Sequence, residues 1–159
     1  MTAKPSKTTT EAKSSIPDAN HEPLSVLVGR WEIEALNPGE PGEMVHGSLT
    51  FEWLSGGRYL IERITIEHPD FPDSIAIIGY DETTGNFTQH YFDSRGVERI
   101  YGMSVINGVW KLWRDMPGFS QRFTGTISDN GSVIMGRWEK SVDGSNWEHD
   151  FDLTYRRSE

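Results

Sequence analysis

Gly29-Arg30-Trp31 opens the first of ten short runs in which apolar and polar residues alternate along the chain. Alternation with a period of two is typical of β-strands that bury one face. Turn signals separate the runs, and the strongest is Asn107-Gly108, because this pair favours the two-residue hairpin turn of type I′. The runs predict strands at residues 31–35, 44–54, 58–66, 74–81, 86–93, 97–103, 109–114, 121–128, 132–141 and 147–156.

No long helical pattern lies between these runs, so consecutive strands are expected to pair as an antiparallel meander. A meander of this length must close on itself or fold over, because exposed strand edges aggregate. We therefore predict an all-β fold, an antiparallel up-and-down β-barrel of about ten strands. A closed barrel of this size usually encloses a pocket.

The chain before the first strand divides into two parts. Residues 1–16 are rich in Lys, Thr and Ser, show no periodicity and lack the apolar segment of a secretory signal, which predicts a disordered N-terminal tail. The residues that follow carry a short apolar set, and we expect a short helical plug there, with Asn20 as its cap. Residues 17–159 are then expected to form a single domain.

The composition of the chain excludes several classes of partner. Its 159 residues carry 15 Lys and Arg against 24 Asp and Glu, and the resulting net charge of −9 disfavours nucleic acid and anionic membrane surfaces. The absence of cysteine excludes disulfides and thiolate metal sites and fits a reducing compartment. No histidines have the spacing of a metal site, so we expect no metal. The lack of cysteine and of a recognisable secretory signal leads us to expect a cytoplasmic protein.

Charged residues interrupt the apolar faces of several predicted strands. In residues 58–66, Glu62 lies on one face and Arg63 on the other, so either orientation brings a charge inside the barrel. Arg99 and Arg137 also share faces with apolar neighbours. Because a charge on an apolar face costs free energy unless it is paired or hydrated, these residues favour a hydrated lumen over a dry core. The alternative is that they lie near strand ends and reach bulk water.

Two segments at opposite ends of the barrel region resemble the calycin superfamily, which includes lipocalins and fatty-acid-binding proteins. They are Leu27-Val28-Gly29-Arg30-Trp31 and the terminal Tyr155-Arg156-Arg157. The resemblance implies a calycin-like, lipocalin-like barrel in which Trp31 lies at the closed end, under an arginine from the last strand. Arg156 and Arg157 are the candidates, and we take Trp31 and Arg156 as the structural pair at the barrel end, held by a cation–π contact.

Further motifs are similar to those of the bacterial DUF1579 family: Gly56-Gly57-Arg58-Tyr59-Leu60-Ile61-Glu62, Ile78-Gly79-Tyr80-Asp81 and Tyr91-Phe92-Asp93-Ser94-Arg95-Gly96. This resemblance covers residues from about 24 to 157 and implies a calycin-like barrel without specifying an activity. A more distant resemblance is to nitrobindin, a haem-binding barrel whose iron-ligating histidine comes from the last strand. It implies haem binding through His149 as an alternative, although the glycines that follow Gly-x-Trp in that family are missing here.

The candidate ligand-binding residues are side chains that would bring a polar group or an aromatic ring into the lumen. Inward arginines would hold a carboxylate by bidentate contact, whereas outward arginines would form cross-strand salt bridges. Trp110 and Trp113 lie three apart in one strand and therefore face opposite sides. His149 shares a face with aromatic residues of the last strand and is expected to point inward. The full set is Arg63, Tyr91, Tyr101, Arg99, Trp113, Arg137 and His149.

We therefore expect the barrel to bind a small, largely hydrophobic ligand whose polar end is held by arginine or tyrosine. An alternative is a cofactor-free isomerase, cyclase or lyase that acts on a hydrophobic metabolite, with His90, His149 or Glu62 as the acid or base. The remaining alternatives are haem binding through His149 and a purely structural barrel. The tryptophan that faces outward from the predicted strand at residues 109–114 is also consistent with a homodimer interface.

Overall fold

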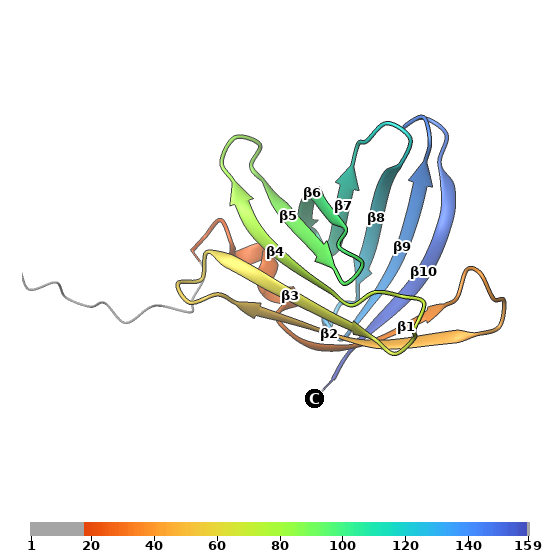
Figure 1. Cartoon of the computed structure of the whole chain (residues 1–159). Helices are drawn as coiled ribbons and strands as arrows, with labels where there is room; N and C mark the ends of the chain where they lie inside the picture. The colour runs from red at the N-terminus through yellow and green to blue at the C-terminus, as the bar shows by residue number, and fades with distance from the viewer. Residues whose placement is uncertain (1–17, 159) are drawn as a thin grey trace, which may run out of the picture.

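This computed structural model describes residues 18–158, which contain ten β-strands and one short 3-10 helix joined by turns and loops. The strands form a closed antiparallel barrel, which confirms the predicted fold class (Figure 1). The tail expected at residues 1–16 lies outside the described residues. The strands are β1 (Gly29–Leu36), β2 (Met44–Trp53), β3 (Tyr59–Ile66), β4 (Ser74–Asp81), β5 (Asn86–Asp93), β6 (Glu98–Ile106), β7 (Val109–Arg114), β8 (Ser120–Ile127), β9 (Val133–Ser141) and β10 (Glu148–Arg157).

Each strand pairs with its neighbours in the sequence, and β10 pairs with β1 to close the barrel. The closing ladder runs from Trp31 opposite Arg157 to Ala35 opposite Leu153. Because the chain reverses direction at every connection, successive connections lie at alternate ends of the barrel. We call the end with the loops after β1, β3, β5, β7 and β9 the open end. The end with the remaining turns, onto which the N-terminal helix packs, is the closed end.

The turn between β6 and β7 shows how local sequence sets the strand pairing. Asn107 and Gly108 both have positive φ, at 52° and 75°, as a type I′ turn requires. β6 therefore continues to Ile106, directly before the turn, although the alternation predicts that it ends at Met103.

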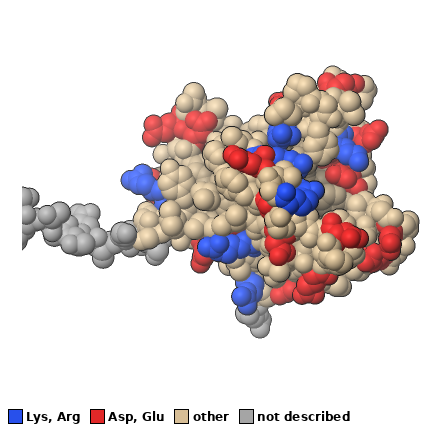
Figure 2. Space-filling model, viewed as in Figure 1, with Lys and Arg blue, Asp and Glu red and all other residues tan. Residues whose placement is uncertain are grey.

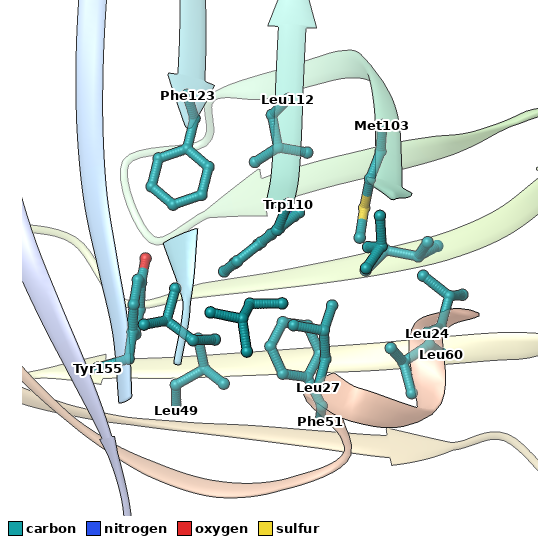
Figure 3. Close-up of a cluster of buried hydrophobic side chains, with 14 of the residues drawn as sticks. Leu24, Leu27, Leu49, Phe51, Leu60, Met103, Trp110, Leu112, Phe123 and Tyr155 are labelled. Atoms are coloured by element: carbon teal, nitrogen blue, oxygen red, sulfur yellow. The ribbon is translucent and has the colours of Figure 1, made fainter. Parts of the chain in front are cut away.

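The predicted helical plug is the 3-10 helix η1 (Glu22–Leu27). Its position is as expected, but its cap is not: the N-cap residue is His21, which makes no side-chain capping bond, and Asn20 lies in the preceding turn. Leu24 and Leu27 are fully buried and point from η1 into the barrel interior (Figure 3). The helix therefore fills the closed end with apolar side chains.

Large aromatic side chains pack the interior next to this plug. The ring centre of Trp110 lies 4.8 Å from that of Phe123 and 5.8 Å from that of Tyr155 (Figure 3). Two glycines that face inward, Gly125 and Gly136, make room for Phe123, since a Cβ on Gly136 would lie 2.6 Å from its ring. This part of the barrel is thus a close-packed core.

β10 departs from strict alternation near its start. Its pairing with β9 shifts between His149 and Phe151, which is the signature of a β-bulge. Phe151 faces the interior as expected, but the shift turns His149 outward, where its Nε2 lies 2.9 Å from Asp152 Oδ1. The expectation that His149 points inward is therefore wrong, and Trp147 lies on the outside as well. Arg122, which is exposed on β8, covers the Trp147 ring with its guanidinium 4.1 Å from the ring centre.

The closed end is fastened by an arginine over a tryptophan, and that arginine is Arg157. Its guanidinium carbon lies 4.2 Å from the ring centre of Trp31, and its nitrogens donate hydrogen bonds of 2.6 and 2.7 Å to two carbonyls just before β1. The prediction that Arg156 has this role is wrong: Arg157 lies opposite Trp31 in the pairing of β1 with β10, and its neighbour Arg156 points to the other face. Gly29 has φ +129°, and a Cβ there would lie 2.7 Å from Arg157 Nη1. The glycine of Gly-x-Trp thus makes room for the arginine.

Candidate functional site

The barrel holds a cavity of about 420 Å³ between its packed core and its open end. Its wall is mostly aliphatic and aromatic, and loop residues of the open end contribute to it, among them Pro38, Phe71, Pro72 and Phe119. Ligand pockets in proteins typically measure about 300–1,000 Å³ and have apolar walls with few polar groups. The cavity is therefore of a size and character suited to a small organic molecule.

A cation lies at the rim of this cavity. Arg99 is the second residue of β6 at the open end, and its guanidinium lies 5.2 Å from the ring centre of Phe119. Within residues 18–158, Arg99 forms no ion pair with a carboxylate. An inward guanidinium without an acidic partner is suited to bind a ligand carboxylate.

Two tyrosines line the wall below the rim, and both hydroxyls are held by hydrogen bonds. Tyr101 donates to Gln121 Oε1 at 2.9 Å, and burial raises the pKa of its hydroxyl. Tyr91 donates to Asp93 Oδ2 at 2.8 Å, and burial followed by this bond raises its pKa as well. Hydrogen bonds from Arg95 and from Tyr91 hold the pKa of Asp93 well below its usual range. Both tyrosines therefore stay neutral and fixed in orientation.

Glu62 brings a carboxyl group to the middle of the cavity wall. It is 4% exposed, and no residue of the described range 18–158 gives it a hydrogen bond or an ion pair. Burial raises its pKa to about 8, because the apolar surroundings disfavour the charged form. At neutral pH burial therefore favours the neutral, protonated carboxyl, whose O–H is available to donate a hydrogen bond.

Two further buried polar groups of the cavity wall have no partner within residues 18–158. Gln89 Oε1 and Trp110 Nε1 are fully buried and make no hydrogen bond within the described part of the chain. Both side chains line the same cavity as Glu62. Buried polar groups are nearly always paired, so each unpaired one calls for an explanation.

Of the seven candidate ligand-binding residues, the structure brings three to the cavity: Arg99, Tyr91 and Tyr101. The other four lie on the outer face. The Arg63 side chain is 55% exposed, and its Nε lies 3.6 Å from Glu52 Oε1. Trp113 packs over the outer face of Gly102. Arg137 and His149 are both exposed.

The geometry does not fit haem binding through His149. Its ring lies outside the barrel against Asp152, so it does not reach the cavity. His90 is also exposed, on the outer face of β5. Of the three groups expected as an acid or base, Glu62 is the one that lines the cavity.

Several residues of the cavity wall are not predicted from the sequence. Gln89 and Gln121 are polar strand residues, which normally face water, yet both point inward because they share a face with Tyr91 and Phe123 respectively. Their position in the alternation is the signal that identifies them. Asp150 reaches the cavity through the bulge in β10, and the period of two gives no sign of it.

The outer surface combines both signs of charge. On the face shown in Figure 2, acidic side chains are spread widely, whereas Lys and Arg gather nearer the middle. With a net charge of −9, the long-range field does not attract anions. An anionic ligand would therefore depend on local contacts at the cavity rim. No helix within residues 18–158 has the length and apolar character needed to cross a membrane.

Comparison with known proteins agrees with the fold. The model of a family described as "Protein of unknown function (DUF1579)" matches residues 16–112. No curated protein matches the chain. Among solved structures, the chain is similar to the crystal structure of Rv2717c from M. tuberculosis, with a TM-score of 0.65 and 12% sequence identity over 91% of this chain and 100% of that one. A likeness at this level of identity shows a common fold.

Proposed function

The chain belongs to the DUF1579 family, whose description states no function, and we propose that it binds a small, largely apolar molecule with an acidic head group. The observation that carries this proposal is an apolar cavity of about 420 Å³ with Arg99 at its rim, where no carboxylate of residues 18–158 forms an ion pair with it. The apolar part of the ligand would gain free energy by leaving water, at about 25 cal/mol per Å² of buried surface.

The rim supplies the geometry for the head group. The planar guanidinium of Arg99 is held against the ring of Phe119 and presents its N–H groups as a fork that matches a carboxylate. Tyr101 and Gln121 form a buried hydrogen bond beside it and stiffen the adjoining wall. The apolar tail then lies against the aromatic and aliphatic side chains deeper in the barrel.

The test combines co-purification with titration. Native mass spectrometry of the freshly purified protein is expected to show a bound small molecule that is released on denaturation. Calorimetric titration with dodecanoate is expected to show saturable binding. Arg99→Gln should weaken that binding by about tenfold, since it removes a charge-assisted contact. Arg63→Gln, an outward arginine, is the matched control and should bind as the wild type does. Absence of binding by dodecanoate and by a panel of other apolar acids would refute the proposal.

A second candidate function rests on Glu62, and it is a cofactor-free proton transfer on a hydrophobic substrate. A carboxyl with a pKa of about 8 in a cavity is matched to taking up and returning a proton near neutral pH. Screening for isomerase, cyclase and lyase activity would test this function. It predicts turnover that Glu62→Gln abolishes while leaving substrate binding intact. A wild-type protein that binds candidate substrates and returns them unchanged contradicts it.

A further inference from the structure

Three polar side chains of the inner cavity wall, Glu62, Gln89 and Trp110, come from three different strands. Glu62 and Gln89 are each the fourth residue from the closed end of β3 and β5, and Trp110 is the second residue from that end of β7. Arg99, by contrast, is the second residue from the open end of β6. The cavity therefore has polar groups at two depths.

The strand pairing links Glu62 to each of the other two groups through intermediate residues. Glu62 pairs with Phe51 of β2, whose ring centre lies 5.7 Å from that of Trp110. On its other side Glu62 pairs with Ala76 of β4, and Ala76 pairs with Tyr91, which lies two residues from Gln89 on the same face of β5. Glu62, Gln89 and Trp110 are 4%, 3% and 2% exposed, so bulk water does not satisfy them.

We propose that Glu62, Gln89 and Trp110 form a second polar subsite, which takes an uncharged hydroxyl group at the end of the ligand opposite to the head group held by Arg99. This inference rests on the proposed function and names the class of ligand more closely: an apolar acid with a hydroxyl at its far end. We call these three residues the inner subsite.

The chemistry of the three groups selects a hydroxyl. Trp110 Nε1–H is a donor, the protonated Glu62 carboxyl both donates and accepts, and Gln89 Oε1 is an acceptor. A hydroxyl also donates and accepts, so its single oxygen can pair with groups of both kinds. An ammonium group has donors alone and would oppose the N–H of Trp110. A second carboxylate would lie in apolar surroundings with no cation, at a high desolvation cost.

The experiment compares each apolar acid with its far-end hydroxyl derivative, for chain lengths of eight, ten and twelve carbons. Calorimetric titration gives the ratio of the two affinities, and the wild type is expected to bind at least one hydroxy acid more tightly than its parent acid. Glu62→Leu should lower the affinity for that hydroxy acid by about tenfold while leaving the parent acid bound as tightly or more tightly. Trp110→Phe should act in the same direction.

Two further variants distinguish an effect at the inner subsite from an effect at the rim of the cavity. Glu62→Gln keeps a donor and an acceptor in the same place, so it should keep the preference for the hydroxy acid. Arg99→Gln should weaken the hydroxy acid and its parent equally. Circular dichroism identifies any variant that fails to fold.

The outcomes are distinguishable. If both acids bind and Glu62→Leu leaves their affinity ratio unchanged, the inner subsite is overturned while the proposed function stands. If dodecylamine binds more tightly than the hydroxy acids, the subsite takes a cation and the proposal is wrong. If the wild type binds none of these molecules, the proposed function fails and the inference fails with it.

Discussion

At the scale of single residues, Glu62 couples the stability of the barrel to pH. Its pKa is raised from 4.5 to about 8 in the folded state, so between these values the folded protein holds a proton that the unfolded chain has lost. The contribution of this residue is therefore fully present below about pH 4.5. As the pH rises to about 8, it decreases by about 1.4 kcal/mol per pH unit.

Urea unfolding of the wild type and of Glu62→Gln at several values between pH 5 and pH 8 measures this effect. The free energy of unfolding of the wild type should fall relative to that of the variant as the pH rises, because the amide does not titrate. Glu52→Gln is the control, since the Glu52 side chain is 61% exposed, and it should follow the wild type. Parallel curves for the wild type and Glu62→Gln would show that Glu62 is ionised in the folded protein.

A second prediction at this scale concerns the two adjacent arginines of β10. Arg157→Ala removes the contact with the Trp31 ring and two short hydrogen bonds to backbone carbonyls, so it should lower the free energy of unfolding by about 2 kcal/mol. Arg156→Ala changes an exposed side chain and should stay within about 0.5 kcal/mol of the wild type. Chemical denaturation of both variants gives the comparison, and equal losses would assign no special role to Arg157.

At the scale of strands, the pair Gly125 and Gly136 sets how β8 and β9 accept the aromatic core. Gly136→Ala would place a Cβ 2.6 Å from the Phe123 ring, and overpacking of this kind typically costs about 1–3 kcal/mol. Gly39→Ala, in the loop after β1, meets its nearest neighbour at 3.4 Å and serves as the control. The melting temperature should fall for Gly136→Ala and change little for Gly39→Ala. If both variants melt alike, Phe123 repacks without cost.

The strands themselves are largely predictable from the sequence, since alternation and turn residues are local signals. Asn107-Gly108 fixes a hairpin by the φ angles that these two residues tolerate, whatever the rest of the chain does. The choice of inner face in β3 is different, because Glu62 lies on one face and Arg63 on the other. Pairing with β2 and β4 decides it, and the long Arg63 side chain reaches water more readily from the outside.

The candidate site is only partly predictable, because which face of a strand points inward depends on strand pairing and on bulges. Arg99 and Tyr101 are found because they share a face with apolar neighbours and no irregularity intervenes. His149 is misplaced because the bulge before Phe151 changes the face, and a period of two carries no trace of an inserted residue. The position of Asp150 in the cavity wall is not predicted, because it depends on the same bulge.

At the scale of the whole molecule, the two ends of the barrel differ in how much change they tolerate. The turn between β8 and β9 supplies the Gly131 carbonyl, which accepts a hydrogen bond of 3.2 Å from Arg157. The loop after β1 is exposed around Glu40 and Pro41. Inserting Gly-Ser-Gly-Ser between Glu40 and Pro41 should therefore cost little beyond loop entropy, about 0.6 kcal/mol for a doubling of loop length. The same insertion after Asn130 should cost clearly more.

Thermal unfolding of the two insertion variants measures this difference directly. A lower melting temperature for the insertion after Asn130 is the expected result, because it separates the Gly131 carbonyl from Arg157 and disturbs the closed end. Equal melting temperatures would mean that the closed end does not depend on this contact.

The alternation of connections between the two ends has a consequence for how such proteins diversify. The five loops after the odd strands surround the entrance, whereas the Trp31–Arg157 contact lies at the closed end, away from those loops. Descendants of one ancestral chain can thus change the length and sequence of the entrance loops, and with them the mouth of the cavity, while the closed end stays unchanged. The same division allows the entrance loops to be redesigned while the closed end of the barrel is kept.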